Sequence, residues 1–266
     1  MSALGLGMFA RIRRVGVAWT PSVLFAGAGV GGWYDPARRA SQFQDAAGTI
    51  PVTAPGQPVG RMLDLSGQGR HASQADAARR PTYQIDGQGL GHLAFDGVDD
   101  LLVTEAIVWN SPQVSFVSAV HKPADTAALV VAEFGSPTDD GSWGFYAPAI
   151  GGSADLTAML RGTDVAFVVC TDLPAPRTAV VSARMETGPL LVGEEIRVQV
   201  DGQTVASTVY GTNAGTGALG TWPLRIGSRV GKVFPFLGRF YGLIMMNRIL
   251  SDAELARAEG WLSARS

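Results

Sequence analysis

Residues 89–109 read GLGHLAFDGVDDLLVTEAIVW, and this stretch decides the fold class. Two apolar runs lie on either side of a short acidic turn at residues 97–100. Runs of this length between Gly- and Asp-rich turns are typical of β-strands. Similar runs continue from about residue 57 to residue 248 at a spacing of about 8–12 residues, a pattern that predicts a sandwich or barrel. We therefore predict an all-β, jelly-roll sandwich.

The composition of the 266-residue chain supports this fold class and excludes others. Hydrophobic residues make up 46% of the chain, which is enough to exclude intrinsic disorder. The net charge of −2 offers no basic face for nucleic acid, so no nucleic-acid partner is expected. No uncharged apolar run is long enough to span a membrane. The 34 Gly and 15 Pro residues indicate many turns.

One substantial helix is expected, near residues 251–264. Ser251 and Glu254 form a capping-box pattern, in which the Ser251 hydroxyl and the Glu254 carboxylate each accept a backbone N–H of the first turn. Leu250 and Leu255 have the spacing of a hydrophobic staple. The face expected to dock on the sandwich carries Leu255, Ala258 and Leu262.

No catalytic constellation is visible in the sequence. Cys170 is the only cysteine, and the three histidines are dispersed, so a zinc site is not expected. His71 follows a turn and is expected to bond to the backbone rather than to act as an acid or base. The GTGALG stretch at 215–220 precedes a strand-like run instead of a helix, so it is read as a loop. We expect no enzymatic activity and no required cofactor.

The acidic turn after residue 95 has two readings. Asp96, Asp99 and Asp100 bring three carboxylates together within five residues, and hard oxygen ligands of this kind bind Ca²⁺. The alternative, which we favour, is a hairpin turn in which the Asp side chains accept local N–H groups and Gly97 takes a positive φ. Calcium at Asp96, Asp99 and Asp100 is therefore the second reading of this turn.

Aromatic residues beside polar turns are the candidates for a sugar-binding surface. Trp143 and Tyr146 follow Asp139 and Asp140, so an aromatic platform would lie beside polar acceptors on a loop at one end of the sandwich. Core packing is the competing explanation for each aromatic side chain, and it carries the greater weight.

Residues 1–28 read as an N-terminal arm ahead of a domain that covers residues 29–266. The arm is apolar but shows no helical or strand period. We expect it to bury its apolar residues on a neighbouring subunit or another protein, with packing on its own sandwich as the alternative. The arm residues expected at such an interface are Phe9, Arg11, Arg13, Arg14, Trp19 and Phe25.

Several motifs resemble those of phage and prophage LamG-like proteins of the concanavalin A-like lectin/glucanase superfamily. The hairpin motif AFDGVDD at 94–100 and the strand-and-turn motif RVQVDG at 197–202 resemble the fold's own signatures. So do FLGRFYG at 236–242 and LSDAE at 250–254. The segments that resemble the leader found ahead of viral members are GWYDP at 32–36, FQD at 43–45, GTIPV at 48–52, GQPVG at 56–60 and DLSG at 64–67.

The resemblance implies a jelly-roll domain in the virion of a tailed phage, in its tail, baseplate or fibre region. Such a protein is made in the bacterial cytoplasm, assembles with other virion proteins and itself as a homo-oligomer, and presents a lectin-like surface to a host glycan or protein. The catalytic triplet of the glucanase branch is absent. Two alternatives remain open: a bacterial carbohydrate-binding module outside any virion, and a glycan hydrolase with an unrecognised acid pair.

Overall fold

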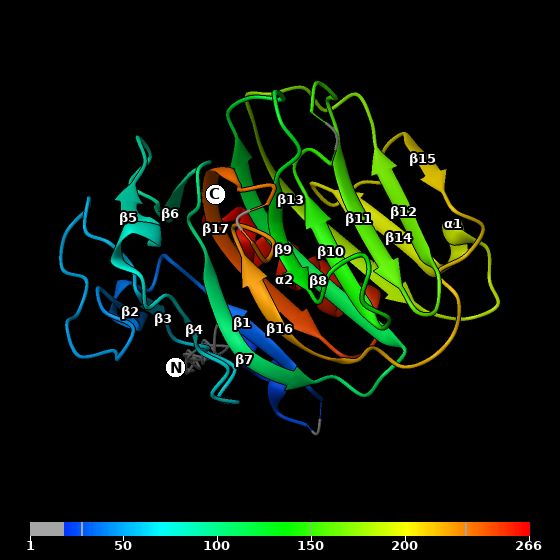
Figure 1. Ribbon diagram of the computed structural model, residues 1–266, viewed down its shortest axis with the longest axis horizontal. Helices are drawn as coiled ribbons and strands as arrows, with labels where there is room; N and C mark the ends of the chain where they lie inside the picture. Colours follow the sequence, from blue (N-terminus) through cyan, green and yellow to red (C-terminus); the bar gives the residue numbers. More distant parts are fainter. Residues whose placement is uncertain (1–18, 28, 150, 232) are drawn as a thin grey trace, which may run out of the picture.

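The computed structural model describes residues 19–27, 29–149, 151–231 and 233–266. Within these ranges the chain forms two antiparallel sheets that pack face to face (Figure 1). Sheet A has seven strands, in the order β14 (Ile196–Val200), β13 (Arg177–Glu186), β8 (Gln113–Lys122), β17 (Leu237–Met246), β6 (Gly91–Asp96) and β5 (Thr82–Ile85), with β1 (Gly31–Tyr34) also paired to β17.

Sheet B has ten strands among the described residues and is the broader of the two. Their order is β15 (Ser207–Tyr210), β12 (Val165–Cys170), β11 (Leu156–Arg161), β10 (Ser142–Tyr146), β9 (Val130–Phe134), β16 (Thr221–Ile226), β7 (Leu102–Val108), β4 (Ala72–Ser73), β3 (Arg61–Met62) and β2 (Gln42–Phe43). The all-β sandwich expected from the strand spacing is therefore confirmed.

The helices are short, apart from the one at the C-terminus. They are the 3₁₀ turns η1 (Pro21–Phe25), η2 (Arg39–Ser41) and η3 (Ala77–Arg79) and the α-helices α1 (Val192–Glu195) and α2 (Asp252–Ser263). The predicted capping box of α2 is confirmed, because Ser251 Oγ accepts the Glu254 N–H and Glu254 accepts the Ser251 N–H. The three residues predicted to face the sandwich are buried, namely Leu255, Ala258 and Leu262.

The stretch 89–109 forms two strands, as predicted, but not a hairpin. β6 pairs with β5 and β17 in sheet A, whereas β7 pairs with β16 and β4 in sheet B. The acidic turn therefore carries the chain from one sheet to the other. Asp100 is buried at this crossing and its Oδ2 accepts the Asp96 N–H, which fixes the turn.

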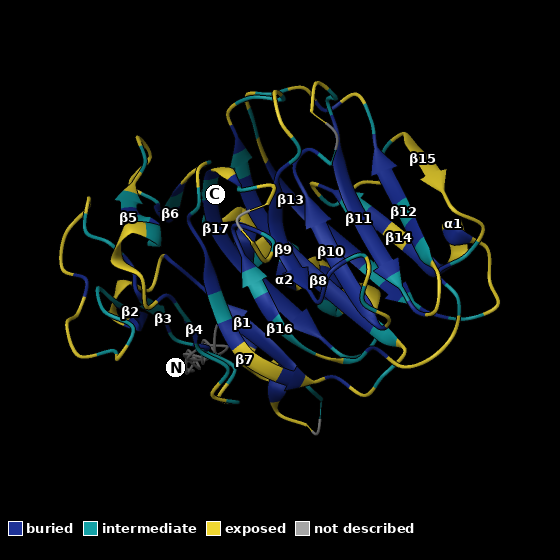
Figure 2. Cartoon of the chain, viewed as in Figure 1, coloured by how far each residue is buried: buried dark blue, intermediate teal, exposed yellow. Residues whose placement is uncertain are grey.

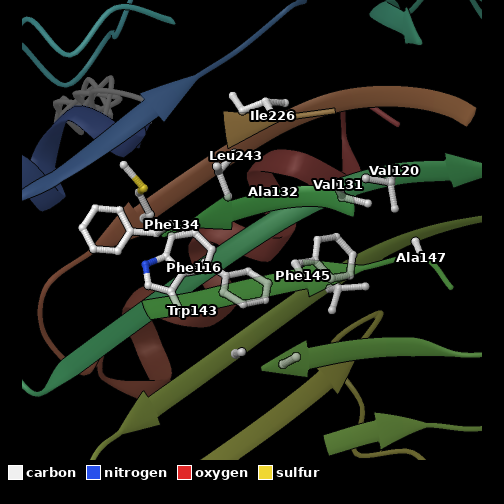
Figure 3. Packing of buried hydrophobic residues seen from close by; sticks show 14 of the residues in the cluster. Phe116, Val120, Val131, Ala132, Phe134, Trp143, Phe145, Ala147, Ile226 and Leu243 are labelled. Carbon is white, nitrogen blue, oxygen red and sulfur yellow. The ribbon is translucent and has the colours of Figure 1, made fainter. Parts of the chain in front are cut away.

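The core lies between the two sheets and is rich in aromatic rings (Figure 3). Trp143 of β10 is fully buried and stacks on Phe116 of β8, with ring centroids 5.5 Å apart. On its other side Trp143 faces Phe134 of β9 at 6.3 Å. The contact between Trp143 and Phe116 joins sheet B to sheet A.

The outer faces of the two sheets differ in how far helices cover them. α2 and η1 cover the outer face of sheet A, where α2 contacts β8, β13 and β17. In Figure 1 the strands of sheet B lie toward the viewer and α2 lies behind them. No described helix packs on the outer face of sheet B to the same extent. Figure 2 shows most of the central strands of sheet B in the colour of buried residues, and Val130, Tyr146 and Met159 form a small buried cluster on this outer face.

Residues 19–27 pack on the domain itself, which corrects the expected arm boundary. Leu24 and Phe25 are buried in the cluster under α2, and the Trp19 ring lies 6.2 Å from that of Trp261. The 3₁₀ turn begins at Pro21 and brings Leu24 and Phe25 to the same side, so this segment uses its apolar residues within the chain. Phe25 is thus buried within the chain, whereas Trp19 is half-buried and its place at a partner interface stays a prediction.

The remaining predicted arm residues lie outside the described residues; they are Phe9, Arg11, Arg13 and Arg14.

Candidate functional site

The outer face of sheet B carries a row of side chains in register across five strands. Phe167 of β12 pairs with Met159 of β11, which pairs with Gly144 of β10. Gly144 pairs with Glu133 of β9, and Glu133 pairs with Arg225 of β16. Residues paired across antiparallel strands share one face, so this row is a continuous strip. It places a charged pair next to an apolar hollow.

Glu133, in the middle of this strip, forms an ion pair with Arg229, whose side chain is partly exposed. Glu133 has no exposed surface, and its carboxylate accepts two bonds from Arg229 Nε, at 3.0 and 3.1 Å, and one from Nη2 at 2.8 Å. The Tyr146 hydroxyl donates to Glu133 Oε1 at 3.0 Å. Burial, together with the negative charge of Glu133, raises the pKa of Tyr146 well above its usual value, so the phenol keeps its proton.

A buried ion pair is weak evidence for stability, because the cost of removing two charges from water often exceeds their attraction. Glu133 and Arg229 are therefore better explained by what they hold in place. The Arg229 guanidinium lies over the rings of Phe234, at 4.9 Å from the centroid, and Tyr146, at 6.0 Å. The pair orders two aromatic rings around one charged group.

Gly144 makes room for the Tyr146 side chain on this face. A Cβ at position 144 would lie 2.5 Å from the Tyr146 hydroxyl oxygen, which is closer than atoms approach. Gly144 therefore allows the phenol to lie down against the sheet and reach Glu133. The register shift between Phe145 and Tyr146 completes this local arrangement.

Phe234 reaches the site on a loop that is tied to sheet B. Its carbonyl accepts the Val130 N–H at 2.9 Å, and Arg229 donates its N–H to Val233. The backbone of Phe234 has φ of 56°, in the left-handed region that a bulky residue seldom adopts. The side chain is 40% exposed. An exposed aromatic ring on strained backbone is a mark of a functional position.

These residues enclose a pocket of about 250 Å³, which we call the outer pocket. Its walls are mainly apolar and aromatic, with Arg229 as the charged group. The lining residues are Ala128, Leu129, Pro137, Tyr146, Ala149, Phe167, Arg229 and Phe234. An apolar hollow with a few fixed polar groups has the character of a small-molecule site.

Trp143 and Tyr146, which were expected to form one platform, lie on opposite faces of sheet B. Trp143 points into the core and has no exposed surface, so it offers no ring to a sugar, and the expectation for this residue is wrong. Tyr146 lines the outer pocket and is 6% exposed. The physical reason is the strand period of two: residues three apart on a strand face opposite ways.

Asp139 and Asp140 shape the loop beside the pocket. Asp139 Oδ2 accepts the Ser136 N–H at 2.9 Å, within the turn. Asp140 accepts a bond from Arg161 Nε at 3.0 Å, and Arg161 also donates to the carbonyl of Pro137, which lines the pocket. These two carboxylates are engaged in holding the loop and do not face the pocket as a pair.

Asp96, Asp99 and Asp100 lie in a turn that their own side chains help to fix. Asp96 Oδ1 accepts the Val98 N–H at 2.8 Å, and Gly97 has φ of 76°. Asp99 lies 3.9 Å from Arg79. In the described part of the chain no group of three or more His, Cys, Asp or Glu residues has the arrangement of a metal site. Calcium binding at this turn stays a prediction.

Two other hollows are less suited to a ligand. A cavity of about 320 Å³ lies at the edge of the sandwich near β14 and β15; of its charged residues, Arg197 is exposed and Arg184 is paired with Asp252 at the surface. A smaller one, of about 130 Å³, includes His71, whose Nδ1 accepts the Asp64 N–H at 3.0 Å. His71 thus bonds to the backbone, as predicted.

The sequence analysis missed Glu133, Arg229 and Phe234. Glu133 carried a usable signal, since it is the one charged residue in the apolar run AALVVAEFG at 127–135. A charge inside such a run marks a strand position that faces away from the core and needs a partner. Its partner Arg229 is 96 residues away in the sequence, and no local pattern connects the two.

Comparison with known proteins bears on the fold alone. No protein-family model matches the chain, and no curated protein matches it in sequence. One structural match is botulinum neurotoxin type C, described by its cell entry through interaction with two ganglioside molecules. The identity is 11% and the TM-score 0.53, over 76% of this chain and 48% of the toxin chain. This chain thus spans about half the length of that structure.

A second match is the Trypanosoma rangeli sialidase in complex with 2,3-difluorosialic acid, at 14% identity and a TM-score of 0.55. It covers 90% of this chain but 33% of the sialidase. A third is the binding domain of botulinum neurotoxin DC in complex with rat synaptotagmin II, at 10% identity and a TM-score of 0.53, over 77% of this chain and 49% of that one. The fold of this chain is thus a jelly-roll β-sandwich of the kind found in these structures.

No helix among the described residues is long and apolar enough to cross a membrane.

Proposed function

We propose that this chain is a non-enzymatic carbohydrate-binding protein that holds a sugar in the outer pocket. We propose further that it is a structural and recognition component of a tailed-phage or phage-like virion. The observation that carries the binding proposal is the outer pocket on sheet B, where Tyr146, Phe167 and Phe234 lie around Arg229 and its ion pair with Glu133.

The outer pocket has the chemistry that a sugar requires. A pyranose ring has apolar C–H faces and a polar rim of hydroxyls, so it needs both an aromatic wall and hydrogen-bonding groups. Phe167 and Phe234 supply apolar walls, and Arg229 supplies fixed donors at the base. Because the ion pair with Glu133 holds Arg229 in place before a ligand arrives, binding orders few side chains.

The carboxylates of the site favour binding over hydrolysis. Glycoside hydrolysis uses two carboxyl groups on either side of the scissile bond. Among the described residues that line or support the outer pocket, Glu133 is the single carboxylate within the site, and Arg229 and Tyr146 occupy it. We therefore propose that the chain binds glycan without cleaving it, and reducing-sugar release from a bound glycan would contradict this.

A virion role is supported by the residues that resemble the leader of viral LamG-like proteins. Part of this leader, GWYDP at 32–36, contributes β1, which pairs with β17 of sheet A. The leader is thus an integral part of the sandwich. Particle composition would identify the neighbouring virion proteins and the number of copies of this chain per particle.

The binding proposal is tested by replacing Phe234 with Gly. The variant removes the exposed ring, and Gly suits a backbone with φ of 56°, so the fold should keep its stability while binding falls. Glycan-array binding and thermal unfolding are measured together. Ile85→Ala, at an exposed apolar position on β5 of sheet A, is the matched control and should bind as the parent does. Unchanged binding by Phe234→Gly would remove the outer pocket from the proposal.

The virion proposal is tested by asking whether purified particles from the producing strain contain this chain in fixed stoichiometry. Co-sedimentation with particles supports it. A soluble chain that never co-sediments, but binds glycan, would instead identify a carbohydrate-binding module outside any virion.

A further inference from the structure

The outer pocket offers a ligand hydrogen-bond donors rather than acceptors. Of the described residues that line it, Tyr146 and Arg229 are the two with polar side-chain atoms. The Tyr146 hydroxyl donates to Glu133 at 3.0 Å and accepts from Arg229 Nη2 at 3.5 Å, so both of its roles are used within the protein. An arginine side chain has N–H donors and no acceptor. A ligand group that enters the pocket therefore meets the donors of Arg229.

One nitrogen of Arg229 is left for a ligand. Nε and Nη2 face the Glu133 carboxylate, with bonds of 2.8 to 3.1 Å. Because a guanidinium is planar, Nη1 points away from that carboxylate. Nη1 forms no hydrogen bond to any residue that the structure describes. Glu133 and Arg229 carry opposite charges in direct contact, so the pair as a whole is neutral and suits a neutral acceptor.

The wall of the pocket around Leu129 is small and apolar. The Leu129 N–H donates to the Pro148 carbonyl at 2.8 Å, and the Leu129 carbonyl accepts the Ala147 N–H at 3.0 Å, so Ala149 lies on a neighbouring segment. Ala128, Leu129 and Ala149 all line the pocket with aliphatic groups. Its volume of about 250 Å³ is below the range of roughly 300–1,000 Å³ for drug-sized ligands. A single sugar unit or one of its substituents therefore suits it better than a chain of sugars.

We infer that the outer pocket binds the acetyl group of an acetylated sugar. This inference rests on the proposed carbohydrate binding at the same pocket and adds the class of sugar. The acetyl methyl would lie against Ala128, Leu129 and Ala149, and the acetyl carbonyl oxygen would accept a hydrogen bond from Arg229 Nη1. N-acetyl and O-acetyl groups share this chemistry, and in both the link to the sugar ring would lie at the mouth of the pocket, in water.

A sugar hydroxyl suits the pocket less well than an acetyl carbonyl does. A hydroxyl is both donor and acceptor, so a hydroxyl that accepts from Arg229 still has its own hydrogen to donate. The described side chains of the pocket hold no free acceptor for it, and burying an unpaired donor costs binding free energy. A carbonyl oxygen only accepts, and the methyl beside it gains free energy on leaving water. The pocket should therefore distinguish an acetylated sugar from its unmodified counterpart.

The test uses a glycan array that prints three forms of each sugar, which differ at one position: the hydroxyl, the N-acetylamino and the O-acetyl form. The full-length chain is the probe, and the parent is compared with Arg229→Lys and Ala128→Leu. The lysine keeps a positive charge toward Glu133 but has no second nitrogen for the acetyl oxygen, and the leucine fills part of the apolar wall. The matched controls are Arg257→Lys and Ala253→Leu, at exposed positions on α2. Thermal unfolding checks that each variant is folded.

We expect the parent to bind acetylated members about tenfold more tightly than hydroxyl members, the effect of one hydrogen bond together with a buried methyl group. Arg229→Lys and Ala128→Leu should each lose most of this preference, and the two α2 controls should keep it. A preference for one acetyl linkage over the other would support the inference and identify the source of the acetyl group. If Arg229→Lys is unfolded, Ala128→Leu decides.

Three outcomes would count against the inference. Equal binding of acetylated and hydroxyl members would overturn it while leaving carbohydrate binding intact. A preference that survives in a folded Arg229→Lys or Ala128→Leu would do the same, because the acetyl group would then be recognised elsewhere. Absence of binding to every member of the array would overturn the proposed function itself along with the inference.

Discussion

At the scale of single residues, Asp100 is a carboxyl group that the fold makes harder to ionise. It is 5% exposed at the crossing between the sheets. Burial, with the charges of Asp96 and Asp99, raises its pKa to about 6 from 3.8. A raised pKa in the folded state means that its contribution to stability is present below pH 3.8 and is lost as the pH rises through 6.

Asp100→Asn should therefore stabilise the protein at neutral pH, since the amide oxygen still accepts the Asp96 N–H but carries no buried charge. We expect a gain of about 1–2 kcal/mol at pH 7 and little gain at pH 4. Urea unfolding at both pH values measures it. Asp172→Asn, at an exposed turn, serves as the control, and an equal effect of Asp100→Asn at the two pH values would contradict the argument.

Trp143 is a core residue, and its replacement should act on the fold. Trp143→Ala leaves a cavity between Phe116 and Phe134, so we expect a loss of about 3–5 kcal/mol in the free energy of unfolding. Denaturant unfolding of the purified variant checks this. A variant that keeps its stability but loses glycan binding would return Trp143 to the binding surface.

At the scale of elements, α2 depends on Glu254 at its start. Hydrogen bonds from Arg248, followed by those from Ser251, lower the pKa of Glu254 to about 2 from 4.5. A lowered pKa means that this stabilisation is present above pH 4.5 and is lost as the pH falls through 2. The carboxylate thus ties the last turn before the helix to its first turn.

Glu254→Ala should cost about 1 kcal/mol at pH 7, the usual worth of a helix cap. Glu254→Gln should cost less, because its amide oxygen still reaches the Ser251 N–H while the charge toward Arg248 is gone. Thermal unfolding at pH 7 and pH 3 measures both variants. The destabilisation by Glu254→Ala should shrink at the lower pH, and a constant difference would show that the charge is unimportant.

Much of the element structure could be predicted from the sequence, and particular residues show where that stops. Ser251 and Glu254 are local signals, so α2 was located with its first turn. The alternation of Ile196, Val198 and Val200 likewise marked β14. The strands that pair with a given strand lie far from it in the sequence. Residues 97–100 therefore do not reveal that β6 and β7 belong to different sheets, because β6 pairs with β5 and β17 whereas β7 pairs with β16.

At the scale of the whole molecule, the cover over sheet A joins distant parts of the chain. Leu24, near the start of the described residues, is 5% exposed in the same cluster as Leu255 and Leu262 of α2. Leu24→Ala should therefore lower the free energy of unfolding by about 2–4 kcal/mol. Val23→Ala, at a neighbouring exposed position, is the control and should have little effect. Denaturant unfolding compares the two variants. Equal free energies of unfolding for Leu24→Ala and Val23→Ala would mean that η1 does not pack stably on the sandwich.

The candidate site was predictable only where its residues belong to a local sequence pattern. Tyr146 was identified from its place beside a polar turn, and it does line the outer pocket. Glu133 and Arg229 come together only when β16 is added beside β9 and the following loop folds back over the sheet. An ion pair between residues 96 positions apart is a product of topology, which single-sequence patterns do not contain.

The contact between Trp19 and Trp261 places the first described segment and the C-terminal helix on the same side of the sandwich. It brings an early segment of the chain against the C-terminal helix, on the side of the sandwich opposite the outer pocket. A molecule fixed to a support through Ser266 would consequently turn the side that carries the outer pocket toward the solution. Biosensor chips or beads coupled at that end should thus display a uniformly oriented layer, whereas coupling through Tyr210, on the pocket side, should mask it.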